Sequence, residues 1–491
     1  MIGLTIFLYA AQYRDGSLWL EILLNSGSEI TLKAKSVSTP RFNIAEIDSP
    51  ISRQIDGNLS IKLMDADKVA FWGFLNRVEP INKHSLIREE DLIREFFAWA
   101  DSQLVIRREK LIFEPTTFSA YESAKTYASQ TGIPHKQILS IPMLNTTVRI
   151  VSGTNTYYFE TPILIKTENE LFINGASLGF SGEFILKSIG ESLIINHFLP
   201  LEDYVGGVIQ NEIGSSAPIE ALKAQAVAAR THAISLLLYN RHKNDGYDLC
   251  NGTHCQVYKG MHLSNNNIIR SVHDTKNQIM VFGERVADAT YHSSCGGKTD
   301  SSANIWKGTP LPFLMGVSCW EECDSLDLTN EKNARAWIDT KVSSAGASSW
   351  ERATLSWEKT VSRSTLENNL GIKGLRHIGI NKRGNSGRIV SISFYGDKKV
   401  TLDSEYRIRQ VFGELSSSFF YIKGGSSVSQ GADVIKATST LQLRGKGSGH
   451  GVGMCQVGAL KRARNGASFT DILQTYYPGI VLSDRWLQSD N

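Results

Sequence analysis

Glu212 is the first residue whose position in the sequence suggests chemistry. Leu201, Val205 and Val208 recur at the spacing of one helix face, and the next position on that face is this glutamate. A carboxyl group that loses water on burial has a raised pKa, which is the property that a general acid needs near neutral pH. The alternative is a glutamate at a helix end whose carboxylate reaches water. The pattern makes Glu212 a candidate catalytic acid.

Thiols and imidazoles gather in two further segments. Cys250, His254 and Cys255 fall within six residues, and farther along Cys295 stands three positions after His292. Zinc prefers these ligand types, and a closed structural site needs four of them. In an oxidising compartment, a disulfide between Cys250 and Cys255 is an equal alternative. For the second segment the alternatives are two further metal ligands, a cysteine nucleophile with its base, or simple packing.

A run of glycines precedes a predicted helix near the C-terminus. Residues 447–453 contain four glycines, which permit positive φ angles and a close approach of the backbone. No Gly-Lys-Ser/Thr follows, so the segment is not a phosphate loop. His450 and Gln456 are polar residues on this turn and favour a surface that faces a ligand. A tight turn between a strand and a helix is the alternative.

The elements that must position these residues include several helices. Apolar spacing predicts one helix over 201–213 and a second that begins at Pro218. Helical spacing is also present over 86–105 and over 454–465. Ser468, with an acidic residue three positions later, predicts the start of a final short helix.

Short strands account for most of the remaining sequence. Apolar and polar residues alternate between turn signals over residues 1–80, and the pattern returns over 148–198. The segment 330–440 is mixed, with strands near 388–395 and 398–402. The sequence therefore predicts an α+β fold with a β-rich N-terminal extension.

Composition excludes several classes of protein. The chain has 491 residues, about three domains in length, and 52 Lys+Arg against 49 Asp+Glu give a net charge of +3, which is too low for a typical nucleic-acid binder. Six cysteines exclude a small disulfide scaffold. No apolar run reaches 18 residues, so no transmembrane segment is predicted. The segment 1–11 is apolar and ends in small residues; it fits a first β-hairpin or a trimmed export signal.

Several ordered blocks together resemble one known family. The blocks are FLPLEDYV at 198–205 with Glu212, EALKAQAVAART at 220–231, CQVYKG at 255–260, HSSCGG at 292–297, GHGVGMCQVGA at 449–459 and YYPG at 476–479. They resemble the stage II sporulation protein D (SpoIID) family, which includes the LytB-type amidase enhancers. The resemblance covers roughly residues 146–482. It predicts a catalytic region at 146–491 that contains a mixed α/β subdomain at 326–440, preceded by an accessory region of strands and then helices at 1–145.

The resemblance implies a bacterial protein of the cell envelope, periplasmic or extracytoplasmic, that acts on peptidoglycan. The family's better-studied members are lytic transglycosylases that cut the bond between N-acetylmuramic acid and N-acetylglucosamine in glycan strands, often strands already stripped of stem peptides, and leave 1,6-anhydro products. The family's catalytic glutamate matches Glu212. Because glycan strands are long, we expect a helical layer that carries this residue to face β-rich segments across an open groove.

The resemblance also implies binding residues. The implied substrate-binding residues are Arg230, Gln256, Tyr258, His292, Ser293, His450 and Gln456. Arg230 is also expected to stabilise the Glu212 carboxylate after proton donation. A structural zinc ion is the one cofactor suggested, with Cys250 and His254 as preferred ligands and His292 and Cys295 next; the chemistry itself requires no cofactor.

Three functions follow from these observations. The first is the lytic transglycosylase, with peptidoglycan glycan strands as partner. The second is a glycan-binding protein without catalytic activity that enhances a cell-wall N-acetylmuramoyl-L-alanine amidase. The third is a cysteine–histidine hydrolase that uses Cys295 or Cys255.

Overall fold

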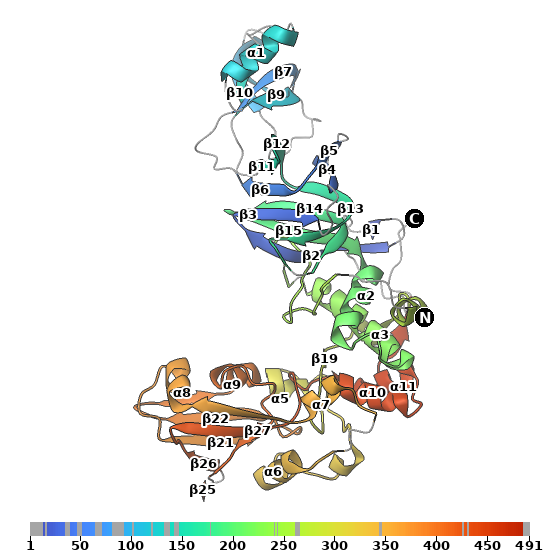
Figure 1. Ribbon diagram of the computed structural model, residues 1–491, viewed down its shortest axis with the longest axis vertical. Coiled ribbons are helices and arrows are strands. Elements are labelled where there is room, and N and C mark those ends of the chain that lie inside the picture. The colour runs from blue at the N-terminus through green and yellow to red at the C-terminus, as the bar shows by residue number, and fades with distance from the viewer. Residues whose placement is uncertain are drawn as a thin grey trace. The chain divides into compact units, whose positions relative to one another are not determined.

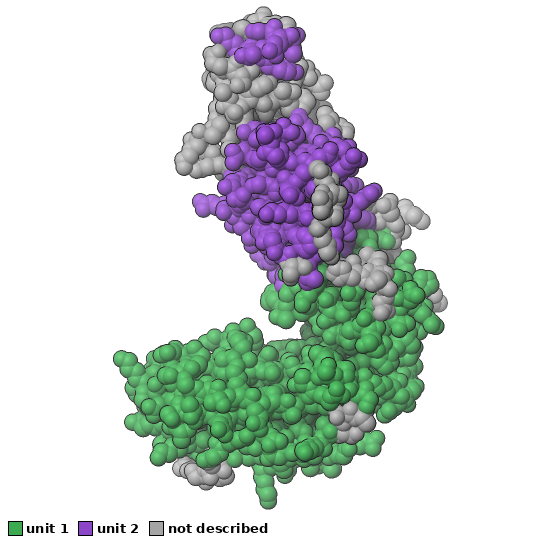
Figure 2. Space-filling model, viewed as in Figure 1, with its two compact units in different colours: residues 1–18, 200–241, 251–491 green, residues 19–199, 242–250 purple. Residues whose placement is uncertain are grey.

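The computed structural model divides the chain into two compact units (Figure 2). Unit 1 consists of residues 1–18, 200–241 and 251–491, and unit 2 consists of residues 19–199 and 242–250. The structure describes residues 13–14, 17–34, 40–46, 52–63, 71–80, 93–100, 103–118, 121–131, 138–141, 147–176, 178–239, 241–242, 244–260, 266–342, 346–424, 427–429 and 432–484. The predicted hairpin or export signal at residues 1–11 lies outside these residues.

A large sheet forms the body of unit 2 (Figure 1). Its main order is β2-β15-β14-β13-β3-β6-β11-β12, with β4 beside β13 and β5 beside β4. Residues alternate between its faces, so that Leu20 and Ile22 of β2 are fully buried while their neighbours are half-buried. The strands are β2 (Ser17–Gly27), β3 (Glu29–Ala34), β4 (Arg41–Glu46), β5 (Ser52–Asp56), β6 (Leu59–Leu63), β11 (Thr147–Ser152), β12 (Asn155–Glu160), β13 (Ile163–Ile173), β14 (Phe180–Ile189) and β15 (Ser192–Pro200).

This sheet crosses the boundary that the sequence predicts at residue 145. Strand β6 pairs with β11, and β3 pairs with β13, so strands from both sides of that position hydrogen-bond to one another. Residues 242–250 join the same unit through β16 (Leu249–Cys250), which runs parallel to β2. The accessory region is therefore not a separate unit. Residues 147–199 complete the sheet that the N-terminal strands begin.

A smaller sheet occupies the segment between β6 and β11. Its order is β10-β7-β9-β8, formed by β7 (Phe71–Pro80), β8 (Ile93–Ala100), β9 (Gln103–Phe118) and β10 (Ile138–Ile141), and it is accompanied by α1 (Tyr121–Thr131). The helix predicted over 86–105 is wrong for the residues that the structure describes. Strand β8 pairs with β9 over its entire length, from Ile93↔Lys110 to Ala100↔Gln103. Neighbouring Phe96 and Phe97 favour such pairing, which outweighs helical spacing.

Helix α3 (Ile219–Leu238) is the centre of the helical layer in unit 1. It contacts α2 (Leu201–Glu212), α4 (Asn266–Asp274), α10 (Gln456–Arg464) and α11 (Phe469–Tyr476), although α10 and α11 are more than 200 residues away along the chain (Figure 1). Its alanines, among them Ala224, Ala226 and Ala228, are fully buried. Small side chains allow the neighbouring helices to pack close on several sides. The predicted helices at 201–213 and after Pro218 are confirmed.

Three short ladders and several short helices complete this layer. The ladders join β17 (Ile279–Phe282) to β18 (Arg285–Val286) and β29 (Val481–Ser483), and β19 (Tyr291–His292) to β28 (Met454–Cys455). The helices are α5 (Ser302–Trp306), α6 (Glu331–Asp339), α7 (Ser349–Leu355) and a 3-10 helix at Glu321–Cys323. The predicted capping box is present at α11, where the Ser468 side chain accepts the N–H of Asp471.

The mixed segment forms a subdomain with its own hydrophobic core inside unit 1. One sheet has the order β20-β27-β24 and the other β23-β22-β21-β26-β25. Its elements are β20 (Trp357–Ser362), α8 (Arg363–Leu370), β21 (His377–Arg383), β22 (Ile389–Tyr395), β23 (Lys399–Leu402), α9 (Glu405–Val411), β24 (Phe420–Ile422), β25 (Ser427–Ser429), β26 (Ala432–Lys436) and β27 (Thr440–Gly445). The core of this subdomain runs from Val361 to Leu443. It begins later than the predicted 326, because Trp337 and Ile338 of α6 pack in the other core of unit 1.

The α+β class is confirmed, because helices and largely antiparallel sheets occupy separate segments of the chain. Across the described residues, no helix has both the length and the apolar character needed to cross a bilayer.

Candidate functional site

Glu212 is the last residue of α2, where the chain turns sharply. Val205 and Val208 on the same helix face are fully buried, whereas Glu212 is half-buried. Two residues later Gly214 adopts φ +84°, a conformation that a residue with a side chain rarely accepts. The apolar face therefore continues into a carboxyl group at a helix end, as the spacing indicated, and the catalytic role of Glu212 stays a prediction.

Both carboxylate oxygens of Glu212 accept hydrogen bonds. The backbone N–H of Val257 donates to Oε1 over 3.0 Å, and Nε2 of Gln456 donates to Oε2 over 3.2 Å. The same Nε2 lies 3.3 Å from Oε1 of Gln225 on α3. These donors come from segments that are up to 244 residues away, so the position of the carboxylate depends on the tertiary structure.

The pKa of Glu212 is raised above its usual value. Burial is the largest cause, since it disfavours the charged carboxylate. The hydrogen bonds from Val257 and Gln456 and the positive potential of His232 act in the opposite direction without cancelling this effect. A carboxyl that retains its proton to higher pH is suited to act as a general acid.

A glycine allows Gln456 to reach this carboxylate. Gly453 has φ +69°, and a Cβ atom at this position would collide with the carbonyl oxygen of Thr290. The close approach lets β28 run parallel to β19, with Tyr291 opposite Met454. Gln456 then begins α10 directly after β28. The predicted ligand-facing turn is therefore a close backbone crossing that holds Gln456 beside Glu212.

A second hydrogen-bond chain holds the segment that carries Val257. Tyr291 donates its hydroxyl proton to Oε1 of Gln256 over 2.7 Å. Nε2 of Gln256 donates to the hydroxyl of Tyr204 over 3.3 Å and to the carbonyl of Ala229 over 3.2 Å. Both the oxygen and the nitrogen of the Gln256 side-chain amide are hydrogen-bonded, so this residue is held in place. The backbone N–H of the next residue, Val257, is thereby directed toward Glu212.

Three residues of this neighbourhood were not predicted from the sequence. Gln225 and Tyr291 belong to the hydrogen-bond chains, and His232 lies close enough to lower the pKa of Glu212. Nδ1 of His232 is 3.5 Å from a carboxylate oxygen of Asp288. The signal that could have identified Gln225 is its isolation, as an amide in the alanine-rich segment 221–229.

Arg230 does not have the predicted place beside Glu212. It is fully buried, and its Nε and Nη2 donate to the two carboxylate oxygens of Glu202 over 2.9 and 2.6 Å. Its Nη1 donates to the carbonyl of Gln278 over 3.0 Å. With these donors engaged, Arg230 ties α3 to the start of α2, and the predicted stabilisation of the Glu212 carboxylate does not fit this geometry.

Most of the other predicted substrate contacts are also in the interior. Tyr258 is 1% exposed, with its ring centroid 5.3 Å from that of Tyr204. A buried side chain cannot touch a polymer without rearrangement, so these residues act as supports. The buried members of the predicted set are Arg230, Gln256, Tyr258, His292 and Gln456.

Ser293 and His450 are half-buried and remain open to a ligand. His450 accepts the N–H of Val452 at Nδ1 over 3.1 Å, and its Nε2 lies 2.9 Å from the carbonyl oxygen of Tyr291. Burial is the main cause that lowers its pKa, so the ring is neutral and offers a face rather than a proton. The ring of Trp306, which is 47% exposed, lies 5.0 Å from it.

The predicted metal ligands belong to both compact units. Cys250 belongs to unit 2 and His254 to unit 1, and their metal site stays a prediction. Cys295 instead lies beside Cys319 and Cys455 inside unit 1, with the three sulfur atoms within 4.8 Å of one another.

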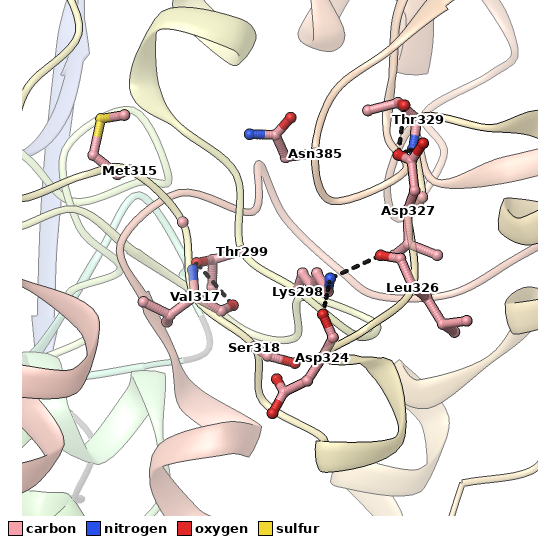
Figure 3. A pocket seen from close by; sticks show the side chains of 12 residues that line it. Lys298, Thr299, Met315, Val317, Ser318, Asp324, Leu326, Asp327, Thr329 and Asn385 are labelled. Carbon is pink, nitrogen blue, oxygen red and sulfur yellow. Dashed lines mark hydrogen bonds between the residues drawn. The ribbon is translucent and has the colours of Figure 1, made fainter.

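One pocket of unit 1 lies apart from these residues (Figure 3). It has a volume of about 400 Å³, and the side chains of Lys298, Thr299 and Asp327 are among its lining. Nζ of Lys298 is occupied by the carbonyl oxygens of Asp324 and Leu326, both at 2.8 Å. None of the predicted site residues lines this pocket.

Comparison with known proteins identifies relatives. Residues 190–282 match the family model described as Stage II sporulation protein, and residues 300–453 match a domain of unknown function. An uncharacterized protein of Brachyspira hyodysenteriae is 29% identical over 66% of this chain and 77% of its own length. The stage II sporulation protein D of Bacillus amyloliquefaciens is 27% identical, over 58% of this chain and 75% of its own length.

The amidase enhancer of Bacillus subtilis is 30% identical over 56% of this chain, but the match spans only 40% of that protein. The first family match contains Glu212 together with the segment of Val257 that binds it. These relatives agree with the blocks found in the sequence. Residues 190–282 thus carry the match to the stage II sporulation protein family, and the chain is similar to stage II sporulation protein D and to an amidase enhancer.

Proposed function

We propose that this protein is a peptidoglycan lytic transglycosylase of the bacterial cell envelope, with Glu212 as its general acid and base. The observation that carries the proposal is the half-buried carboxyl of Glu212, whose pKa is raised and whose two oxygens are held by Val257 and Gln456. Its family relatives are named for sporulation and for amidase enhancement, which supports a role in the cell wall.

One carboxyl group is enough for this reaction. Protonated Glu212 gives its proton to the glycosidic oxygen as the bond from the anomeric carbon of N-acetylmuramic acid breaks. The carboxylate then accepts the proton of the O6 hydroxyl of the same sugar, whose oxygen bonds to the anomeric carbon. The products are a 1,6-anhydro end and a free N-acetylglucosamine hydroxyl, and no water is consumed. The hydrogen-bonded neighbours of Glu212 are two amides, which suits a mechanism without a second carboxylate.

The accessible side chains suit a sugar polymer. Trp306 and His450 present adjoining rings at a partly exposed position, and aromatic faces pack well against the apolar faces of sugars. Ser293 supplies a half-buried hydroxyl in the same segment as Tyr291. We place the glycan strand along these residues, while the buried amides keep the acid in position.

Product analysis tests the proposal. The native chain, Glu212→Gln and the exposed control Glu191→Gln are incubated with intact and with peptide-stripped glycan strands, and the products are analysed by mass spectrometry. Anhydro-muramic ends are expected from the native chain and the control, and not from Glu212→Gln. Absence of cleavage by all three proteins, with binding of the strands retained, would refute the enzymatic proposal.

The relative named amidase enhancer favours a second function, a glycan-binding protein without catalysis that enhances an N-acetylmuramoyl-L-alanine amidase. The two functions differ in what Glu212→Gln does. An enhancer should raise the activity of an added amidase equally well with and without this carboxyl group. Release of stem peptides by the amidase is therefore measured in the presence of each variant.

A further inference from the structure

Three cysteines from distant segments meet inside unit 1. The sulfur atoms of Cys295, Cys319 and Cys455 lie within 4.8 Å of one another, and none of these residues is more than 6% exposed. Cys295 follows β19, Cys319 lies just before the 3-10 helix, and Cys455 ends β28. All three are free thiols in the structure. The acid chemistry proposed above uses none of them.

The spacing of the sulfurs suits a single tetrahedral ion. Zinc binds thiolates at about 2.3 Å, which places two sulfurs of one tetrahedral site about 3.8 Å apart. The three sulfur atoms lie within 4.8 Å of one another, so each pair would have to approach by at most about 1 Å to reach that separation. Three thiolates leave one position of the tetrahedron for a fourth ligand.

His292 adjoins the cluster and is the candidate for that fourth ligand, although its ring nitrogens are not within 4.8 Å of all three sulfurs, so its side chain would have to move toward the ion. It is directly opposite Cys455 in the β19–β28 ladder and is 4% exposed. Its Nδ1 lies 3.1 Å from the carbonyl oxygen of Val452, so an Nδ1–H donor there leaves the lone pair on Nε2. Among the described residues, this buried Nε2 has no hydrogen-bond partner. Metal-binding histidines usually donate the other ring N–H to a carbonyl or carboxylate in this way.

Hydrogen-bond donors also approach the three sulfurs. The sulfur of Cys455 accepts the backbone N–H groups of Cys295 and Gly458 over 3.2 and 3.3 Å, that of Cys295 accepts the N–H of Gly297 over 3.4 Å, and that of Cys319 lies 3.2 Å from the hydroxyl of Tyr476. Such donors stabilise thiolates more than neutral thiols, because an ionised acceptor makes the stronger bond.

A buried cation accompanies the cluster. The guanidinium of Arg388 is fully buried and donates to the carbonyl oxygen of Cys295 over 2.9 Å. Three thiolates, a neutral imidazole and a divalent ion carry one net negative charge. The positive charge of Arg388, which also faces the buried carboxyl groups of Glu405 and Asp300, offsets part of it and so lowers the cost of placing a charged centre in the interior.

We propose that His292, Cys295, Cys319 and Cys455 bind one zinc ion. His292 and Cys295 thereby keep the metal role that the sequence suggested, with two partners from other segments. The ion would be structural, because four protein ligands close its coordination sphere. It would join the loop before the 3-10 helix to the β19–β28 ladder, directly before Gln456 of the acid site.

Metal analysis of the full chain tests the site. Native protein, Cys319→Ser and Cys319→His are purified without chelators, and zinc per chain is measured by inductively coupled plasma mass spectrometry. Cys319→Ser should hold one zinc ion fewer than the native chain, whereas Cys319→His keeps a ligand and retains it. Cys323→Ser is the control, since this neighbouring buried cysteine is outside the cluster. Equal zinc in native and Cys319→Ser proteins would overturn the proposal.

A second measurement does not require any variant to fold. Native protein is treated with a thiol-alkylating reagent with and without a zinc chelator, and labelled peptides are identified by mass spectrometry. Cys295, Cys319 and Cys455 should become labelled together only after chelation. Labelling that is independent of the chelator, or a disulfide between two of the three in non-reduced peptides, would contradict the metal site.

Discussion

Replacement of Arg230 by methionine separates a structural role from a substrate contact. The guanidinium is fully buried, and it donates two hydrogen bonds to the Glu202 carboxylate and one to the carbonyl of Gln278. Methionine keeps much of the volume but removes every donor. Arg230→Met therefore leaves Glu202 as an unpaired carboxylate at the junction of α2 and α3.

The expected loss of stability follows from these contacts. Removal of one partner of a buried ion pair costs about 3–5 kcal/mol. The Glu202 side chain is 20% exposed and still accepts the N–H of Asn277 over 3.3 Å, so its carboxylate recovers some solvation. We expect about 3–4 kcal/mol, or two to three orders of magnitude in the opening equilibrium of α3. The double variant Arg230→Met with Glu202→Met should recover most of this loss, because it removes both charges.

Native-state hydrogen exchange of α3 peptides measures this change locally. Lys423→Met is the matched control: its ion pair with Glu358 is 2.9 Å long but solvent-exposed, and the variant should change stability by less than about 1 kcal/mol. Unchanged protection of α3 in Arg230→Met, together with weaker glycan binding, would refute the structural role. That result would restore Arg230 to the substrate groove.

Four further predictions concern the acid site. The folded protein favours protonated Glu212, because the pKa of this residue is raised on folding. The resulting contribution to stability is fully present below the usual pKa of 4.5 and is lost as the pH rises through the folded-state pKa. In thermal denaturation, Glu212→Gln should therefore become more stable relative to the native chain as the pH increases. Gln456→Leu removes a hydrogen bond that lowers this pKa, so the basic limb of the pH–activity profile should move to higher pH, and a shift to lower pH would contradict the geometry. Gly453→Ala should unfold the backbone crossing at a cost of more than about 2 kcal/mol, whereas Gly466→Ala, with φ +89° and open space around it, should cost about 1 kcal/mol in chemical denaturation. Trp306→Ala should weaken glycan binding in a sedimentation assay without changing thermal stability, because the ring is 47% exposed.

Local patterns in the sequence predicted the framework of the site. The spacing of Leu201, Val205 and Val208 identified the buried face of α2, and Pro218 identified the start of α3. These signals lie within a few residues of the element that they specify. For the same reason the position of Glu212 at the end of an apolar face could be recognised before its partners were known.

Contacts between distant segments could not be predicted in this way. Arg230 and Glu212 are 18 positions apart and belong to neighbouring blocks of sequence, but the side chain of Arg230 turns toward Glu202 at the other end of α2. The prediction for residues 93–100 failed for a related reason: their pairing with β9 is decided by a partner, and helical spacing in one segment carries no information about it. Unit 2 likewise joins strands on both sides of residue 145, so the start of the family resemblance was no guide to its boundary.

The β19–β28 ladder shows why the polar residues in the signature blocks are buried. Met454, Cys455 and Gln456 are consecutive, and each makes a different contact, since the first pairs with Tyr291, the second faces two other thiols, and the third binds Glu212. A backbone crossing this close tolerates little change in register. A shift of one residue would place the thiol of Cys455, instead of the amide of Gln456, beside Glu212. The glycines around it and the proposed zinc ion would therefore act on catalysis indirectly, by fixing the register that places Gln456 beside the carboxyl group.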